Sequence, residues 1–163
     1  FTNSGLIHDF ASGEFATTEL TSIVMFKSFE SKDYGVLSYA SGASDNDYLI
    51  FNRNDDMNIY RGGNVATGVN YNTNTYNILL HTWNNGGNAT FYKNGSNAST
   101  ISGNTNIDGN IQDDGSLVMG NEQDTEGGGY VTDQVFNGDV AEFFIYNREL
   151  NLPQITIVNN YLA

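Results

Sequence analysis

The sequence contains no cysteine, which excludes disulfide bonds, thiolate metal sites and cysteine catalysis. Basic residues are also scarce: 6 Lys and Arg stand against 19 Asp and Glu, for a net charge of −13. A nucleic-acid partner or an anionic membrane surface would demand a basic face, so both are disfavoured. The 2 histidines, His8 and His81, are too few and too isolated for a histidine-rich zinc site.

Long apolar runs are absent as well. No segment approaches the ~20 apolar residues that a membrane-spanning helix needs, so we expect no membrane insertion. The chain is nevertheless 39% hydrophobic and 13% aromatic, which is too apolar for a disordered protein. Its 163 residues fit a single domain over residues 1–163. Because the chain begins with Phe1 rather than Met, we expect a mature or excised piece.

Short apolar and β-branched runs, separated by Gly, Asn and Asp clusters, predict an all-β protein. The expected strands cover residues 22–29, 35–39, 48–52, 58–61, 76–83, 89–93, 116–119 and 139–146. Asn94-Gly95 follows an aromatic pair and is a strong hairpin signal, and residues 85–87 predict another turn. The polar residues 98–115 are read either as one long loop or as a weak edge strand.

The last predicted strand and the C-terminal segment have different hydrophobic patterns. Residues 143–146 place apolar side chains on both faces, which is typical of central strands in a β-sandwich. The last segment has helical spacing instead, with Asn151 as a candidate N-cap and Pro153 near the first turn. We therefore predict a short C-terminal helix that packs on the sandwich and carries no chemistry.

The acidic residues are clustered in loops. Asp45-Asn46-Asp47 precedes a predicted strand, Asp55-Asp56 lies in the next turn, and residues 121–126 run into three glycines, with Asp133 and Gln134 shortly after. Carboxylate, amide and backbone oxygens at short spacing on glycine-containing loops are the ligands of Ca²⁺. The alternative is a set of solvated loop acids, and the residue pattern leaves both open.

The order of these motifs carries a family resemblance. The motifs are Ser38-Tyr39-Ala40, Asp45-Asn46, Leu49-Ile50-Phe51, Thr82-Trp83, Phe91-Tyr92-Lys93-Asn94-Gly95 and, most specifically, Met119-Gly120-Asn121-Glu122-Gln123-Asp124. Together they resemble the pentraxin family, of the laminin-G-like and concanavalin A-like lectin superfamily, over residues 23–161. The resemblance implies a two-sheet antiparallel jelly-roll β-sandwich with a short C-terminal helix.

The resemblance also implies two adjacent calcium ions on one face of the sandwich. The first ion would be held by Asp45, Asn46, Glu122, the backbone carbonyl of Gln123, and Asp124. Glu122 and Asp124 would bridge to a second ion, completed by Gln134. Pentraxins use such ions to bind phosphate monoesters, phosphocholine-like head groups and some carbohydrates. Phe51 matches the aromatic residue that packs against choline methyl groups.

Further ligand contacts are expected beside the acidic loops. Tyr60 and Tyr48 are candidates by position, and Asp133 is a third. An acid of the second calcium site falls on Val131, and Asp133 or Glu126 would have to compensate for it. His81 and Trp83, in a predicted strand, are expected to be structural. Arg61 and Lys93 are conceivable anion clamps but are not assigned, given how few basic residues the chain has.

Three features depart from the family pattern. The positions of its disulfide fall near Val24 and Leu80, so apolar packing is expected to replace the bridge. The acid that pairs with a choline cation falls near Val65, which argues against phosphocholine specificity. Animal pentraxins also continue beyond the position of Ala163. A module of a larger surface protein therefore fits better than a serum pentraxin, and a cyclic homo-oligomer is not safely inherited.

Two other functions remain open. Glu122, Asp124 and Glu126 alternate as the carboxylates of a retaining glycosidase would, but Gln123, Thr125 and the following glycines indicate a loop rather than a catalytic strand. A spacer domain of an adhesin, with purely structural calcium, is the second alternative.

We expect a non-enzymatic, calcium-dependent, lectin-like module that acts in adhesion outside the cell, secreted or at the cell surface. Its cofactor would be one or two Ca²⁺ ions. Its ligand would be a carbohydrate or a phosphomonoester on a cell surface or matrix.

Overall fold

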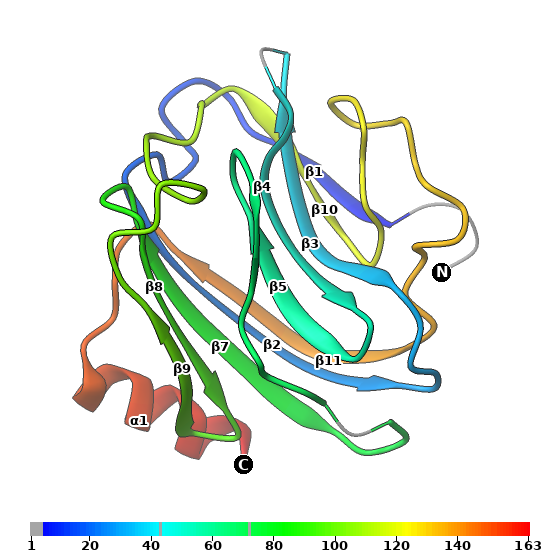
Figure 1. Ribbon diagram of the computed structural model, residues 1–163, viewed down its shortest axis with the longest axis vertical. Helices are drawn as coiled ribbons and strands as arrows, with labels where there is room; N and C mark the ends of the chain where they lie inside the picture. Colours follow the sequence, from blue (N-terminus) through cyan, green and yellow to red (C-terminus); the bar gives the residue numbers. More distant parts are fainter. Residues whose placement is uncertain (1–4, 43, 72) are drawn as a thin grey trace.

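The computed structural model describes residues 5–42, 44–71 and 73–163, with side chains for all of them except Ser44 and Asp45. Within these ranges, eleven strands form two antiparallel sheets that face each other, and one helix lies outside them (Figure 1). The predicted all-β sandwich with a short C-terminal helix is confirmed.

The two sheets contain strands from distant parts of the chain. The six-stranded sheet has the order β1 (Leu6–Asp9), β10 (Gly115–Met119), β3 (Tyr34–Ser41), β4 (Ser44–Arg53), β5 (Asp56–Tyr60) and β6 (Asn64–Ala66). The five-stranded sheet has the order β11 (Gly138–Tyr146), β2 (Glu19–Ser28), β7 (Asn77–Asn84), β8 (Asn88–Lys93) and β9 (Ser96–Ile101). All eight predicted strands are present. The edge strands β1 and β6 were not predicted, and the edge strand β9 overlaps a segment that the sequence left open.

The main core lies between the sheets. Alternate residues of each strand face inward, and the largest of them, Trp83, is fully buried, as predicted. Its Nε1 donates a hydrogen bond to the carbonyl oxygen of Ile107 at 2.7 Å. This bond fastens the polar segment after β9, which the sequence analysis left open, to the interior of the sandwich. Residues 98–115, left open as a loop or a weak edge strand, therefore contain the end of the edge strand β9, a loop, and the first residue of β10.

A polar network is also buried between the sheets. His81 Nδ1 lies 2.8 Å from Ser22 Oγ, and its Nε2 lies 2.5 Å from the Tyr48 hydroxyl. The ring is fully buried and nearly parallel to the ring of Phe91. Burial lowers the pKa of His81 to about 3. The structural role expected for His81 is confirmed, whereas the ligand contact expected for Tyr48 is wrong, because Tyr48 is a core residue.

The helix α1 (Leu152–Leu162) covers the outer face of the five-stranded sheet. It begins as predicted: Asn151 Oδ1 accepts from the Gln154 backbone N–H at 3.1 Å, and Gln154 Oε1 accepts from the Asn151 N–H at 3.0 Å. Ile155 and Leu162 pack there in a second apolar cluster with Ile23.

Apolar packing stands where the family has its disulfide, but one of the two residues differs by one position from the pair expected from the sequence. Leu80 lies opposite Ile23, and both belong to the cluster under α1. Val24 instead faces the main core. The pair named from the sequence, Val24 and Leu80, therefore points to opposite faces of the sheet, and Ile23 is the residue that packs with Leu80.

The β8–β9 hairpin offers a simple test of turn chemistry. Asn94 and Gly95 have φ of 49° and 81°, as a type I′ turn requires, and Asn94 Oδ1 accepts from the Ile78 N–H at 2.8 Å. We expect Asn94→Ala to lower the free energy of unfolding by about 1–2 kcal/mol, because alanine resists positive φ and cannot accept this bond. Urea unfolding measures the change, with exposed Asn97→Ala as the control.

Candidate functional site

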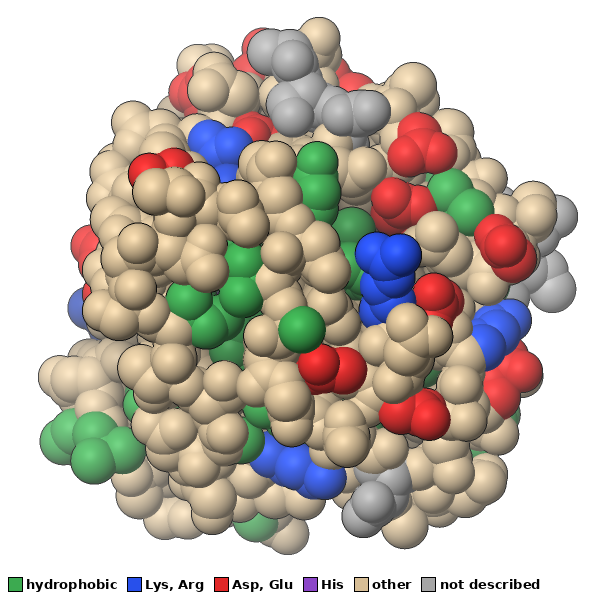
Figure 2. Space-filling view, in the orientation of Figure 1, with side chains coloured by type: hydrophobic (Ala, Val, Ile, Leu, Met, Phe, Trp, Pro, Cys, Tyr) green, Lys and Arg blue, Asp and Glu red, His purple; other side chains and the backbone are tan. Residues whose placement is uncertain are grey.

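A pocket of about 330 Å³ opens on the outer face of the six-stranded sheet, on the opposite side of the sandwich from α1. Its lining residues are Asp33, Asn46, Leu49, Phe51, Arg53, Tyr60, Asn64, Glu122 and Gln134. Acidic side chains gather over this side of the molecule, at the right of Figure 2, and the Lys and Arg side chains there are isolated among them. The pocket thus collects segments that are up to about one hundred residues apart in sequence.

An irregularity in β4 directs Asn46 toward this pocket. Tyr39 pairs with Tyr48 and Ser41 pairs with Ser44, so three residues of β4 lie opposite one residue of β3. Extra residues of this kind change which face of a sheet a side chain occupies. Asn46 accordingly lines the pocket, while its neighbour Asp47 is 1% exposed and turned inward.

Asp47 is held by a buried ion pair and belongs to the scaffold. Its Oδ1 lies 3.1 Å from Arg61 Nη1, and its other oxygen accepts from the Gln112 backbone N–H. Desolvation raises the pKa of Asp47, opposed by the Gln112 hydrogen bond and the Arg61 charge. Arg61, considered from the sequence as an anion clamp, is therefore occupied inside the fold.

Gly35 positions the loop that carries Glu122. A Cβ atom at this residue would lie 2.5 Å from the Asn121 carbonyl carbon and 2.7 Å from the Glu122 nitrogen. The Gly35 N–H also donates to the carbonyl oxygen of Gln134 at 3.0 Å. Both loop segments of the pocket therefore rest on one residue of β3 that has no side chain.

Gln123 is locked by its side chain. Its Nε2 donates to the carbonyl oxygens of Ser38 and Ser116, both at 2.8 Å, and its Oε1 accepts from the Gly127 N–H at 2.9 Å. The residue is fully buried. These bonds fix the backbone directly after Glu122, so the side chain of Gln123 is structural and only its carbonyl group is a candidate ligand.

The base of the pocket is aromatic. Phe51 lies on β4 with 8% of its surface exposed, and Tyr60 on β5 lies opposite Leu49 in the neighbouring strand. Strand alternation places Leu49 and Phe51 on the same outer face. The sequence predicted both Phe51 and Tyr60 as ligand contacts, and both line the pocket.

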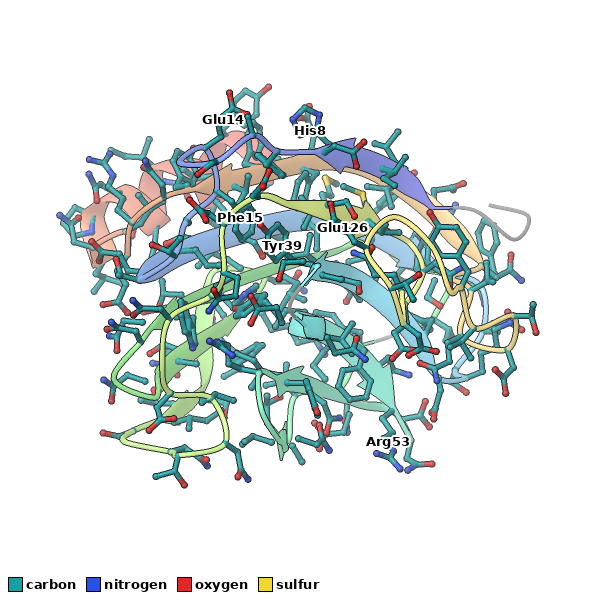
Figure 3. The ribbon with its side chains drawn as sticks, turned by 90° about the horizontal axis from the view of Figure 1, so that it is seen from above. His8, Glu14, Phe15, Tyr39, Arg53 and Glu126 are labelled. Atoms are coloured by element: carbon teal, nitrogen blue, oxygen red, sulfur yellow. The ribbon has the colours of Figure 1, made fainter. Side chains whose placement is uncertain are left out.

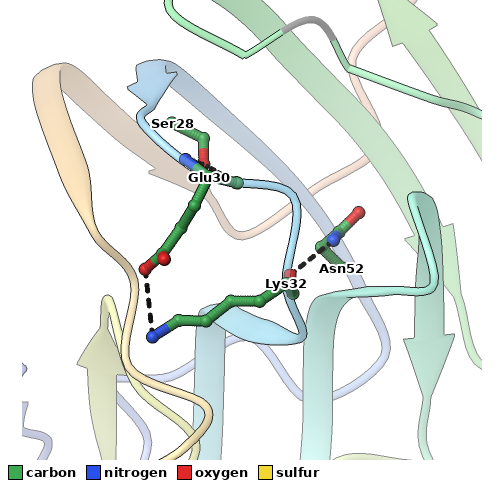
Figure 4. A network of polar contacts seen from close by, with 4 residues as sticks. All are labelled: Ser28, Glu30, Lys32 and Asn52. Atoms are coloured by element: carbon green, nitrogen blue, oxygen red, sulfur yellow. Dashed lines mark hydrogen bonds and ion pairs between the residues drawn. The ribbon is translucent and has the colours of Figure 1, made fainter.

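The β2–β3 connection brings Asp33 to the rim. This loop is held by a network in which Lys32 pairs with Glu30 at 3.0 Å and Asn52 Nδ2 donates to the Lys32 carbonyl oxygen at 2.7 Å (Figure 4). Asp33 Oδ1 then accepts from the Asn54 N–H at 3.0 Å, at the tip of the β4–β5 hairpin. Asp33 thus ties the two loops on either side of the pocket together.

The predicted site residues are only partly brought together. Asn46, Glu122, Gln134, Phe51 and Tyr60 all line the pocket. Asp124 and Asp133 are exposed and do not line it, and the Asp45 side chain lies outside the described part of the chain.

Three polar lining residues, Asp33, Arg53 and Asn64, were missed. Cross-strand pairing of Tyr60 with Asn64 and Leu49 places Asn64 there, a relation that no local motif signals.

Calcium binding depends on which oxygen ligands the side chains of the pocket supply. Among the side chains that the structure describes, no group of three or more His, Cys, Asp or Glu is placed to hold a metal ion. The pocket does contain the carboxylates of Asp33 and Glu122 and the amides of Asn46, Asn64 and Gln134, and Asn46 Nδ2 donates to Glu122 Oε1 at 3.2 Å. Hard oxygen donors of these kinds are those that Ca²⁺ prefers. The residues present therefore fit the ion chemically.

The comparisons with known proteins identify the family of the chain. The model of the Pentaxin family matches residues 10–162. The chain belongs to the pentaxin (pentraxin) family. No curated protein sequence gives a significant match. Members of the family bind ligands rather than catalyse reactions, and membership supports a lectin-like binding module.

Solved structures share the fold at low identity. The native heptameric SAP-like pentraxin from Limulus polyphemus has a TM-score of 0.75 and 19% identity, over 98% of this chain and 83% of that one. The ligand-binding domain of botulinum neurotoxin serotype D, in complex with N-acetylneuraminic acid, has a TM-score of 0.64 and 14% identity. This chain spans only 41% of that neurotoxin domain. At these identities the likenesses show the jelly-roll fold alone. No helix in the described residues is long and apolar enough to cross a membrane.

Proposed function

We propose that this pentaxin domain is a calcium-dependent lectin-like module, and that its pocket on the six-stranded sheet binds a carbohydrate or a phosphate-bearing ligand. The observation that supports this most directly is the convergence of Asn46, Glu122 and Gln134, from three separate segments, beside the aromatic base of the pocket. Calcium would supply a positive charge with open coordination positions for ligand oxygens. Phe51 and Tyr60 would contact the apolar face of the ligand.

The chain's own residues would share the work of holding calcium. Glu122 would contribute a carboxylate, Asn46 and Gln134 amide oxygens, and Gln123 its backbone carbonyl, with Asp45 and Asp124 adjacent in sequence. A cation beside Glu122 would repel the NH₂ group of Asn46, which now donates to that carboxylate. We therefore expect the Asn46 amide to turn its oxygen toward the ion.

The test is calorimetric titration of chelator-stripped protein with Ca²⁺. We expect saturable binding and a raised melting temperature, since an ion that binds only the folded state stabilises it. Glu122→Gln should weaken binding at least about tenfold, because it removes the charge of the proposed carboxylate ligand that lines the pocket. Glu126→Gln, in the same loop but outside the pocket, is the control with the same change in charge and should behave like the parent protein.

The results separate the alternatives. Calcium binding that is unaltered in Glu122→Gln would overturn the assignment of this site. Calcium binding without any glycan or phosphomonoester binding would favour the structural spacer. Absence of calcium binding would contradict the proposed function. The protein would then be assayed for glycosidase activity, with Glu122, Asp124 and Glu126 as the candidate carboxylates.

Assembly and location are also proposals. A heptamer is described for the Limulus pentraxin. We propose that this chain acts outside the cell, either as a cyclic homo-oligomer or as one domain of a larger surface protein. Light scattering on the purified chain distinguishes a ring from a monomer.

A further inference from the structure

Arg53 is the one basic residue that lines the pocket. It is the last residue of β4, two positions after Phe51, and strand alternation puts both on the outer face of the sheet. Figure 3 shows its side chain projecting away from the sandwich, at the far side of the molecule from His8 and Glu14. Its guanidinium group therefore lies at the rim of the pocket and is accessible to a ligand.

The other cations of the chain are largely engaged by the protein. Only 6 Lys and Arg are present. Lys27, Lys32 and Arg61 form ion pairs with Asp139, Glu30 and Asp47 at 2.8, 3.0 and 3.1 Å. Lys93 Nζ donates to the Asn70 carbonyl oxygen. Arg53 forms no ion pair within the part of the chain that the structure describes.

The acids near Arg53 have other structural tasks. Asp33, on the same rim, accepts a hydrogen bond from the Asn54 backbone N–H. Glu122 accepts from Asn46 and belongs to the proposed calcium ligands. The hairpin that presents Arg53 is also tight, since Asn54 and Asp55 at its tip have φ of 53° and 62°. Asp56, directly opposite Arg53 on β5, accepts from the Val69 backbone N–H at 3.1 Å. None of these acids forms an ion pair with Arg53 in the described residues, so its guanidinium group is available to an external anion.

We propose that Arg53 recognises a carboxylate group on a sugar, so that the pocket prefers acidic carbohydrates such as uronic acids over neutral ones. This inference rests on the proposed function of the same pocket and goes beyond it in naming the ligand class. The planar guanidinium donates two parallel N–H bonds to a carboxylate, and bonds to charged groups are the stronger ones. The aromatic base and the amides of Asn46, Asn64 and Gln134 are suited to a ring with hydroxyl groups.

The dimensions agree with a small ligand. At about 330 Å³, the pocket is near the lower end of the range of about 300–1,000 Å³ for small-molecule sites. The lining combines the Arg53 guanidinium with aromatic and amide groups and with the carboxylates of Asp33 and Glu122, so Arg53 is the one lining side chain that would attract an anionic group directly. A long glycan would therefore be recognised through a single acidic residue in the pocket, with the remainder outside.

The test uses three probes that share one ring: D-glucuronate, D-glucose and D-glucose 6-phosphate, each titrated in calcium. We expect glucuronate to bind about tenfold more tightly than glucose. Arg53→Gln should remove most of this preference, and Arg53→Lys should keep part of it, because lysine retains the charge but not the planar fork. Arg148→Gln, an exposed arginine elsewhere, makes the same change in net charge and should leave the preference intact.

Calcium affinity is measured in the same variants. Arg53→Gln should bind calcium as well as the parent protein or slightly better, since a nearby positive charge is removed. Equal binding of glucuronate and glucose, with calcium binding intact, would overturn the role of Arg53 and leave the proposed function standing. Tighter binding of the 6-phosphate than of glucuronate would overturn the carboxylate assignment. Loss of calcium binding in the parent protein would instead contradict the proposed function itself.

Discussion

Replacing Gly35 by alanine should lower the melting temperature by about 5–10 °C and weaken calcium binding at least about tenfold. The added Cβ would meet the backbone of Asn121 and Glu122 at 2.5–2.7 Å, and backbone atoms cannot move aside as a flexible side chain can. Overpacking of this kind costs about 1–3 kcal/mol, and the loop that carries Glu122 would have to lift from β3. Differential scanning calorimetry and calcium titration measure the two effects.

Gly62→Ala is the matched control. The nearest atom to a Cβ there is the Asn106 carbonyl oxygen at 3.9 Å, which is ordinary van der Waals contact. Its φ lies outside the left-handed region, so alanine should leave both stability and calcium affinity close to those of the parent protein. A Gly35→Ala protein with parental calcium affinity would show that the position of the Glu122 loop does not govern the site.

The short motifs of the sequence predicted part of the pocket lining, but they missed the charged residues that lie at its rim. Glu122 and Gln134 belong to loops whose composition already indicated ligands, and the family resemblance placed them together. Arg53 and Asp33 lie in segments with no motif of their own. They reach the pocket because β4 pairs with β5 in one register and because the β2–β3 loop is tied to the hairpin tip at Asn54. Such relations come from pairing between strands and are not visible in a local pattern.

Side-chain direction was the least predictable property. Asn46 and Asp47 look equivalent as loop acids and amides, yet the irregularity in β4 sends one to the pocket and the other to a buried ion pair with Arg61. The same irregularity fixes which side of the sheet the following residues occupy. Tyr48, expected beside the ligand, therefore turns to the core and contacts His81.

The strands that the sequence missed have weak patterns for a physical reason. All four residues of β1 are exposed, so Leu6 and Ile7 do not alternate with buried positions. In β9 only Asn, Ser, Thr and a single Ala precede Ile101, and the strand lies at an edge. Central strands such as β3, where every residue is buried, were predicted easily because their apolar content reflects two covered faces.

Acidification should destabilise the protein strongly through His81. Its pKa is about 6.5 in an unfolded chain and about 3 in the folded protein, where burial disfavours the charged ring. Between these values the unfolded chain binds a proton that the folded chain does not, so the free energy of unfolding falls as the pH falls. From pH 7 to pH 4.5 this single group should remove about 2–3 kcal/mol, measured by urea unfolding at each pH.

A second buried group, Asp47, changes the free energy of unfolding with pH in the opposite direction to His81. The pKa of Asp47 is raised by desolvation in the fold, so its stabilising contribution is lost as pH rises, and its protonation in acid offsets part of the His81 effect. A triple variant, Ser22→Ala, Tyr48→Phe and His81→Phe, replaces the whole network with apolar groups and leaves no hydrogen-bonding partner unpaired. Over the same pH range, its free energy of unfolding should fall by about 2–3 kcal/mol less than that of the parent protein.

Substitution of the exposed histidine, His8, is the control that separates the effect of burying His81 from the mere presence of a histidine. His8 lies on the exposed strand β1, and His8→Gln should keep the full acid sensitivity of the parent protein. If the triple variant lost stability in acid as steeply as the parent, carboxylates elsewhere would have to carry the pH dependence. A shallow slope confined to the triple variant would instead show that one imidazole, enclosed between two sheets, sets the acid limit of the fold.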